Sequence, residues 1–104
     1  MAFVALEKLH RLYDGYRRVF RLAGQEWVLL QEQGKLYCFA NQCPHLNAPL
    51  QHASISDHIL RCPLHGLEFD LRNGRPENRS NCKNTLTLLP LIYELNQVGV
   101  DAGR

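Results

Sequence analysis

Two short segments of the chain each place a cysteine close to a histidine. One residue separates Cys43 from His45 in CPHLNAPL, and two residues separate Cys62 from His65 in CPLHGLEFD. Thiolate sulfur and neutral imidazole nitrogen are the donors that proteins use for zinc and for iron–sulfur clusters. Because sixteen residues lie between the two pairs, each pair would occupy its own loop. The first hypothesis is therefore a metal centre with four protein ligands.

The residues beside these donors favour a cluster over a single metal ion. Pro44 and Pro63 fix φ directly after each cysteine, and Gly66 lets the chain turn closely past a bulky inorganic group. A Cys2His2 set is also adequate for tetrahedral zinc, but zinc modules usually take both cysteines from one knuckle and both histidines from another. Two loops that each give one cysteine and one histidine instead suit a [2Fe–2S] cluster with unlike ligands on its two irons. A catalytic cysteine–histidine pair is disfavoured, since nothing distinguishes one thiol as a nucleophile.

At this spacing the sequence resembles the Rieske proteins. The resemblance extends beyond the paired motifs to three further segments and covers nearly the whole chain. These segments are APL at 48–50, HGLEFD at 65–70 and LPLIYEL at 89–95. The resemblance implies an all-β, small antiparallel Rieske-type fold, with stacked β-sheets and a cluster-binding subdomain made of two ligand loops.

The resemblance also implies the ligand set of one Rieske-type [2Fe–2S] cluster. Cys43 and Cys62 would bind the inner iron, and His45 and His65 the outer iron, with the imidazole edges near solvent. Replacing two thiolates by neutral imidazoles makes it easier to add an electron and raises the reduction potential above that of all-cysteine clusters. The outer iron would take the electron, and the histidine edges would face a redox partner.

Positions that bind no metal indicate a low-potential member of the family. The high-potential members, which oxidise quinols, have a disulfide between the two loops, and its cysteines would fall at Ala48 and Leu64. They also have a serine and a tyrosine whose hydroxyls bond the cluster sulfurs, at the positions of Leu67 and Phe69. We therefore expect a potential near the bottom of the Rieske range, on the order of −150 mV.

A stand-alone Rieske domain of 104 residues looks like a Rieske-type ferredoxin. The chain has no room for the iron domain of an oxygenase and no G-x-G-x-x-G for a flavin or nicotinamide cofactor. The resemblance implies an electron carrier, not an enzyme, without catalytic residues or a small-molecule substrate. Its partners would be a flavoprotein reductase and a terminal oxygenase or reductase. Two alternatives remain open: a small subunit like that of nitrite reductase, and a zinc-stabilised interaction domain.

Composition predicts a single small globular domain in the cytoplasm. The chain is 45% hydrophobic and 21% charged, and its formal net charge is +2. The arginines of residues 17–21 alternate with apolar residues like one solvated strand face, which does not favour nucleic-acid binding. No apolar run approaches the roughly 18 residues of a membrane span, and no signal peptide is visible. Cys38 falls within an apolar strand and is expected in the core, and Cys82 lies in a polar loop. A disulfide between them is disfavoured, because disulfides are rare in the cytoplasm.

Short apolar or alternating runs broken by turn residues predict the elements that carry the loops. Residues 1–104 form one domain in this prediction, with cluster-binding loops at about 43–50 and 62–70. Asn47 stands where the family often has glycine, although asparagine also tolerates the left-handed region. Turns are expected at 23–25, 33–34, 73–74 and 96–97. Strands are expected at 2–6, 16–22, 26–30, 35–40, 59–61, 67–71, 85–88, 91–95 and 98–100.

Overall fold

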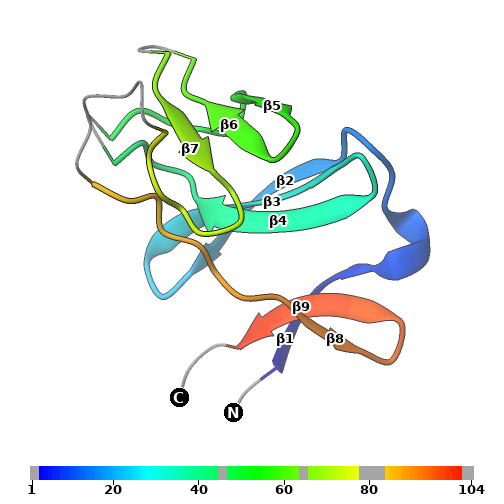
Figure 1. The fold of residues 1–104 in the computed structure, drawn as a ribbon. Helices are drawn as coiled ribbons and strands as arrows, with labels where there is room; N and C mark the ends of the chain where they lie inside the picture. Colours follow the sequence, from blue (N-terminus) through cyan, green and yellow to red (C-terminus); the bar gives the residue numbers. More distant parts are fainter. Residues whose placement is uncertain (1–2, 45–46, 64–65, 78–83, 102–104) are drawn as a thin grey trace.

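The computed structural model of the chain describes residues 3–44, 47–63, 66–77 and 84–101 (Figure 1). These residues form an all-β structure, as the sequence predicts, with one short 3-10 turn. The elements are β1 (Phe3–Lys8), η1 (Leu9–Arg11), β2 (Arg17–Leu22), β3 (Gln25–Glu32), β4 (Lys35–Ala40), β5 (Ser54–Ser56), β6 (Ile59–Arg61), β7 (Glu68–Asp70), β8 (Ile92–Glu94) and β9 (Gln97–Asp101).

The strands form three antiparallel sheets that are stacked on one another. β2, β3 and β4 form the middle sheet in the order of the chain. β5, β6 and β7 form a small sheet on one side of it, drawn at the top of Figure 1. β1, β9 and β8 form the third sheet on the other side. The predicted stack of sheets with a separate loop-bearing subdomain is thereby confirmed.

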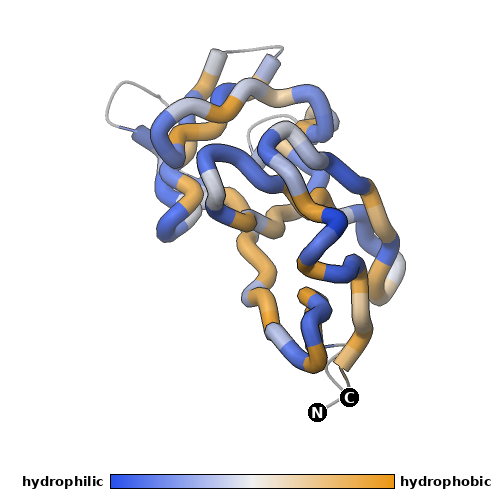
Figure 2. Tube along the Cα trace, turned by 90° about the vertical axis from the view of Figure 1, so that its right-hand side faces the viewer, coloured by the Kyte–Doolittle hydropathy of each residue, from blue (hydrophilic) through white to orange (hydrophobic). Residues whose placement is uncertain are grey.

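β3 is buried on both faces because it runs through the middle layer. Trp27 and Leu29 point into the core shared with the β1-β9-β8 sheet. Val28 and Leu30 point into the core shared with the β5-β6-β7 sheet. A strand between two cores needs an unbroken apolar run, which explains the sequence WVLL. The end of β4 is also buried on both faces, with Cys38 and Ala40 in the first of these cores and Phe39 in the second. Figure 2 shows apolar stretches interspersed with hydrophilic ones along the trace.

Two-residue turns join the strands of the middle sheet. Ala23 and Gly24 both have positive φ, at 54° and 79°, and Gln33 and Gly34 repeat the pattern at 52° and 75°. Positive φ at both central residues is the type I′ geometry that matches the twist of a hairpin. The glycine in each pair accepts it without strain. These two turns were predicted, and the first is one residue shorter than expected.

Three elements differ from the sequence prediction. The last hairpin turns at Leu95 and Asn96 rather than at 96–97, with φ of 50° and 64°. Residues 85–88 form no strand but a single bridge between Leu88 and Phe39, because this segment crosses the open edge of β4 between two layers. β5 was not predicted, since its three residues SIS are too short to show a period. No helix in the described part of the chain is long and apolar enough to cross a membrane.

Candidate metal centre

The first predicted ligand loop joins β4 to β5 and is closed by two backbone hydrogen bonds. The Cys43 N–H donates to the carbonyl oxygen of Ala48 at 2.7 Å. The Asn47 N–H donates to the carbonyl oxygen of Cys43, also at 2.7 Å. Asn47 has φ of 61°, so it occupies the left-handed region that the sequence analysis expected it to tolerate.

The second predicted ligand loop joins β6 to β7 and repeats this closure. The Cys62 N–H donates to the carbonyl oxygen of Leu67 at 2.8 Å, and the Gly66 N–H donates to the carbonyl oxygen of Cys62 at 2.9 Å. Gly66 has φ of 68°. In both loops the cysteine therefore bonds the residues four and five positions later, and the residue four positions later is left-handed. The two loops have the same local backbone design although their histidine spacings differ.

Both cysteines lie in the core between the middle sheet and the β5-β6-β7 sheet. Cys43 is 0% exposed and Cys62 is 1% exposed, and both belong to one cluster of packed side chains with Leu50 and Phe69. The structure thus brings two predicted ligands from separate loops into one buried cluster. The other two, His45 and His65, lie outside the described residues.

Asn41 ties the two ends of the first loop together, a role that the motif analysis missed. Its side-chain oxygen accepts the N–H of Leu50 at 2.7 Å. Its side-chain nitrogen donates to the Glu26 carboxylate at 3.1 Å and to the Gln51 side-chain oxygen at 2.9 Å. Asn41 is only 8% exposed; its bond with Leu50 is buried, and the other two bonds are partly buried. A polar residue directly after the buried end of β4 was the available signal in the sequence.

Two uncharged amides also support the first loop at its surface. Gln42 donates to the side-chain oxygen of Asn47 at 2.7 Å. Asn84 donates to the carbonyl oxygen of Pro44 at 3.2 Å, which attaches the start of the described C-terminal segment to the loop. Both of these surface contacts of the first loop are therefore made by uncharged side chains.

Asp70, at the end of β7, orders the turn that follows the second loop. Its carboxylate accepts the backbone N–H of Arg72 at 2.8 Å and the Arg72 guanidinium at 2.8 Å. Its backbone carbonyl accepts the N–H of Gly74 at 2.6 Å. The hydrogen bonds from Arg72 hold the pKa of the Asp70 carboxyl below its usual range. Asp70 is 7% exposed and so is not a surface turn residue.

The two remaining cysteines have no assigned part in the centre. Cys38 lies in the opposite core, 4% exposed, and burial raises the pKa of its thiol to about 12. It is a neutral core residue, as predicted, because the thiolate form is strongly disfavoured there. Cys82 lies outside the described residues.

The donor set and its surroundings fit a [2Fe–2S] cluster. Cys43 and Cys62 come from two loops with equal backbone closure, so each loop can contribute one sulfur in the same way. The packed apolar side chains around them exclude water, which is a recognised control on cluster potential. Left-handed Asn47 and Gly66 turn the backbone back after each histidine position.

Comparison with known proteins decides the family. A family model described as the Rieske [2Fe-2S] domain matches residues 2–93. The chain belongs to this family. The cofactor of this Rieske chain is accordingly one Rieske-type [2Fe–2S] cluster.

The curated relatives include long and short proteins. The chain is 31% identical over 67 residues to apoptosis-inducing factor 3 of Mus musculus, but that match covers 64% of this chain and only 11% of the relative. The Rieske chain therefore spans about a tenth of the length of that protein. It is 27% identical over 93 residues to the ferredoxin component of the naphthalene 1,2-dioxygenase system of Pseudomonas aeruginosa, covering 89% of this chain and 88% of the relative.

Solved structures give the same fold. The ferredoxin of carbazole 1,9a-dioxygenase from Nocardioides aromaticivorans IC177 superposes with a TM-score of 0.81. The match covers 96% of this chain and 97% of that one, at 24% sequence identity. At this identity the likeness establishes the stacked-sheet architecture rather than the function.

Proposed function

We propose that this Rieske chain is a one-electron carrier whose cluster is held by Cys43, Cys62, His45 and His65. The observation that carries the proposal is the pair of buried cysteines on two loops with equal backbone closure, in a chain of the Rieske family. By the family resemblance, the cysteines would bind the inner iron and the histidines the outer one. The predicted binding loops at 43–50 and 62–70 contain all four.

When bound, the cluster supplies a centre that gains and loses one electron. The chain itself contributes placement and shielding. The buried cysteines hold their end of the group away from water, within a core that includes Leu50 and Phe69. Asn41 and the backbone bonds of both loops fix the ligands before the electron arrives. A site that changes little on reduction is suited to fast electron transfer.

We propose a low potential for this carrier, on the order of −150 mV. Leu67 packs against the core and Phe69 is fully buried, and neither has a hydroxyl to donate to a cluster sulfur. Ala48, where the high-potential members have a cysteine, has only a methyl side chain and is 6% exposed. Without these hydrogen bonds, the extra negative charge of the reduced state is less stabilised.

The partners that fit this function are a flavoprotein reductase as donor and a terminal oxygenase as acceptor. The relative from Pseudomonas aeruginosa, matched along most of both chains, is the ferredoxin component of a naphthalene 1,2-dioxygenase system. The Rieske chain would carry the electron between them without a substrate of its own, so it is a component of an oxidoreductase system and not itself the enzyme. A cytoplasmic location fits these partners and stays a prediction.

The decisive experiment measures iron, acid-labile sulfide and zinc in the chain purified without air. We expect equal amounts of iron and sulfide, as a [2Fe–2S] cluster requires, and a rhombic EPR signal after reduction. Voltammetry should then give a potential well below 0 mV. Stoichiometric zinc without iron would support the zinc-stabilised interaction domain instead. A tight complex with a reductase or oxygenase chain on gel filtration would favour a subunit over a mobile carrier.

A further inference from the structure

Arg61 brings a positive charge against the second ligand loop. It is the last residue of β6, directly before Cys62, and its side chain is exposed. A Cβ built on Gly66 would lie 3.3 Å from Nη2, 3.6 Å from Nε and 3.9 Å from Cζ of Arg61. The guanidinium therefore lies on the face of Gly66 that has no side chain. A larger residue at this position would push it away.

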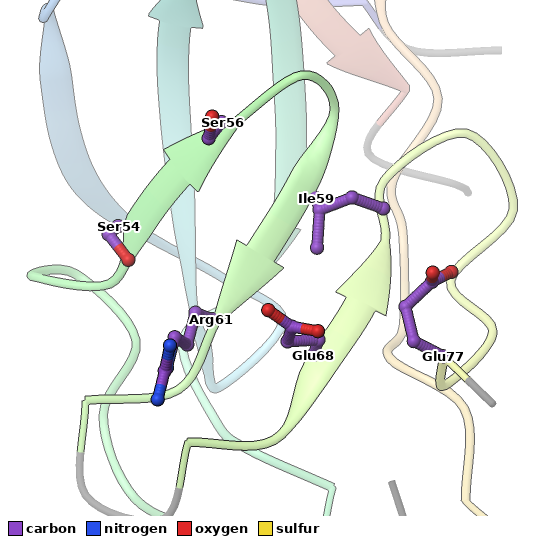
Figure 3. Close-up of a pocket in the computed structure, with 6 residues that line it drawn as sticks. All are labelled: Ser54, Ser56, Ile59, Arg61, Glu68 and Glu77. Atoms are coloured by element: carbon purple, nitrogen blue, oxygen red, sulfur yellow. The ribbon is translucent and has the colours of Figure 1, made fainter. Parts of the chain in front are cut away.

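The Arg61 side chain points toward the second ligand loop rather than toward the residues paired with it on β5 and β7. Arg61 is paired with Ser54 on β5 and with Glu68 on β7, in one row across the sheet. In Figure 3 its guanidinium turns toward the end of β6, where the ligand loop begins. Glu77 lines the same hollow but lies on the far side of β7 (Figure 3). Within the described part of the chain, no hydrogen bond or ion pair of the Arg61 side chain is found.

The two loops differ in this respect. The surface hydrogen bonds of the first loop are made by the uncharged amides Gln42, Asn47 and Asn84. The charged groups on that side bond the two ends of the loop: Glu26 accepts from Asn41, and Arg17 donates to the carbonyl oxygen of Gln51. At the second loop a guanidinium, which stays charged at every pH at which proteins are folded, lies 3.3 Å from the position that a Cβ of residue 66 would take. A charge of this kind acts on whatever charge the adjacent centre gains or loses.

We propose that Arg61 tunes the electron affinity of the cluster by stabilising its reduced state. This inference rests on the proposed ligand set. Reduction adds one electron to the cluster and breaks no bond, so the centre becomes more negative by one charge. A positive charge beside the second ligand loop favours that state. The carboxylate of Glu68 opposes the effect, but the guanidinium occupies the space beside Gly66 of the loop itself.

The test compares reduction potentials of the cluster-loaded chain and its variants by voltammetry, with the electrode as the electron source. We expect Arg61→Gln to lower the equilibrium constant for reduction by about two- to fivefold, which is roughly 20–40 mV at 59 mV per tenfold. Arg61→Lys should keep most of the wild-type potential. In about 1 M salt the difference should shrink, because the screening length falls to about 3 Å.

Arg11→Gln is the matched control, since it also removes one exposed positive charge but lies in η1, away from the loops (Figure 1). Its shift should be less than a third of that of Arg61→Gln. Equal shifts for the two variants, with full iron and sulfide content, would overturn the inference and leave the proposed function intact. Iron loss in Arg61→Gln, or a loss of folding stability without a shift in potential, would also overturn it, because Arg61 would then be structural. Absence of a cluster in the wild-type chain would instead reject the proposed function.

Discussion

The two ligand loops share their backbone design and differ in what holds them in place. Each closes on its cysteine through the residues four and five positions later. The first loop is pinned by a buried amide, Asn41, which joins its two ends. The second is followed by a turn held by an ion pair between Asp70 and Arg72. Equal geometry around the cysteines with unlike supports shows that the core requires the closure but not one particular anchor.

The largest predicted effect is loss of the cluster when either loop cysteine is replaced. Cys43→Ala and Cys62→Ala should each abolish the cluster completely, because neither loop can replace the sulfur of the other. Iron and acid-labile sulfide per chain measure this directly. Cys38→Ala is the matched control, since it removes an equally buried sulfur from the opposite core and should keep the cluster. If one of the two loop variants retained a full cluster, the equivalence of the loops would be wrong.

The second prediction concerns Asn41, which joins the two ends of the first loop. Asn41→Ala leaves the buried N–H of Leu50 without its acceptor, which should lower the free energy of unfolding by about 1–3 kcal/mol. The cluster should also be lost faster on dilution into a chelator. Urea unfolding and the decay of visible absorbance measure the two effects.

Gln42→Ala serves as the control for this experiment, because it removes an exposed amide contact of the same loop. Its effect on stability should stay within about 0.5 kcal/mol. Similar losses in the two variants would show that Asn41 is not a special anchor.

The third prediction concerns the left-handed residue of each loop. Gly66→Ala places a Cβ at φ of 68° and against Arg61, so it should cost about 1–2 kcal/mol of unfolding free energy. Asn47→Gly keeps the conformation that the first loop needs and should change stability by at most about 0.5 kcal/mol. Thermal or urea unfolding compares the two. A well-tolerated Gly66→Ala would mean that the second loop does not require left-handed geometry.

The smallest predicted effect is the pH dependence of the second loop's anchor. Because Arg72 lowers the pKa of folded Asp70, the contribution of this pair is present above the unfolded pKa near 3.8. It is lost as the pH falls through the lower, folded value. Asp70→Asn should therefore reduce stability at about pH 6 and match the wild type more closely at roughly pH 3.

Arg72→Gln should show the same convergence, since it removes the other half of the pair. The anchor of the first loop is an amide and does not titrate, so the stability loss in Asn41→Ala should change little over this range. Parallel pH profiles for the Asp70 and Asn41 variants would contradict the comparison.

The sequence by itself determined the donors, the strand-rich class and most of the turns. These features depend on residues that are close in the sequence. The type and spacing of the donors indicate a metal centre, and a pair such as Gln33 and Gly34 indicates a turn with positive φ. The strand at 26–30 was likewise predicted, but not that two different cores would share it.

Only the tertiary structure decided which distant groups meet at the loops. Asn41 reaches Leu50 and Glu26, nine and fifteen residues away, because the middle sheet brings the end of β4 beside both. Arg61 covers Gly66 because β6 leads directly into a loop that folds back on it. Residues 85–88 alternate like a strand, yet they bridge two layers with only one pairing. Contacts of this kind depend on how the layers pack together, and a local sequence pattern does not predict that packing.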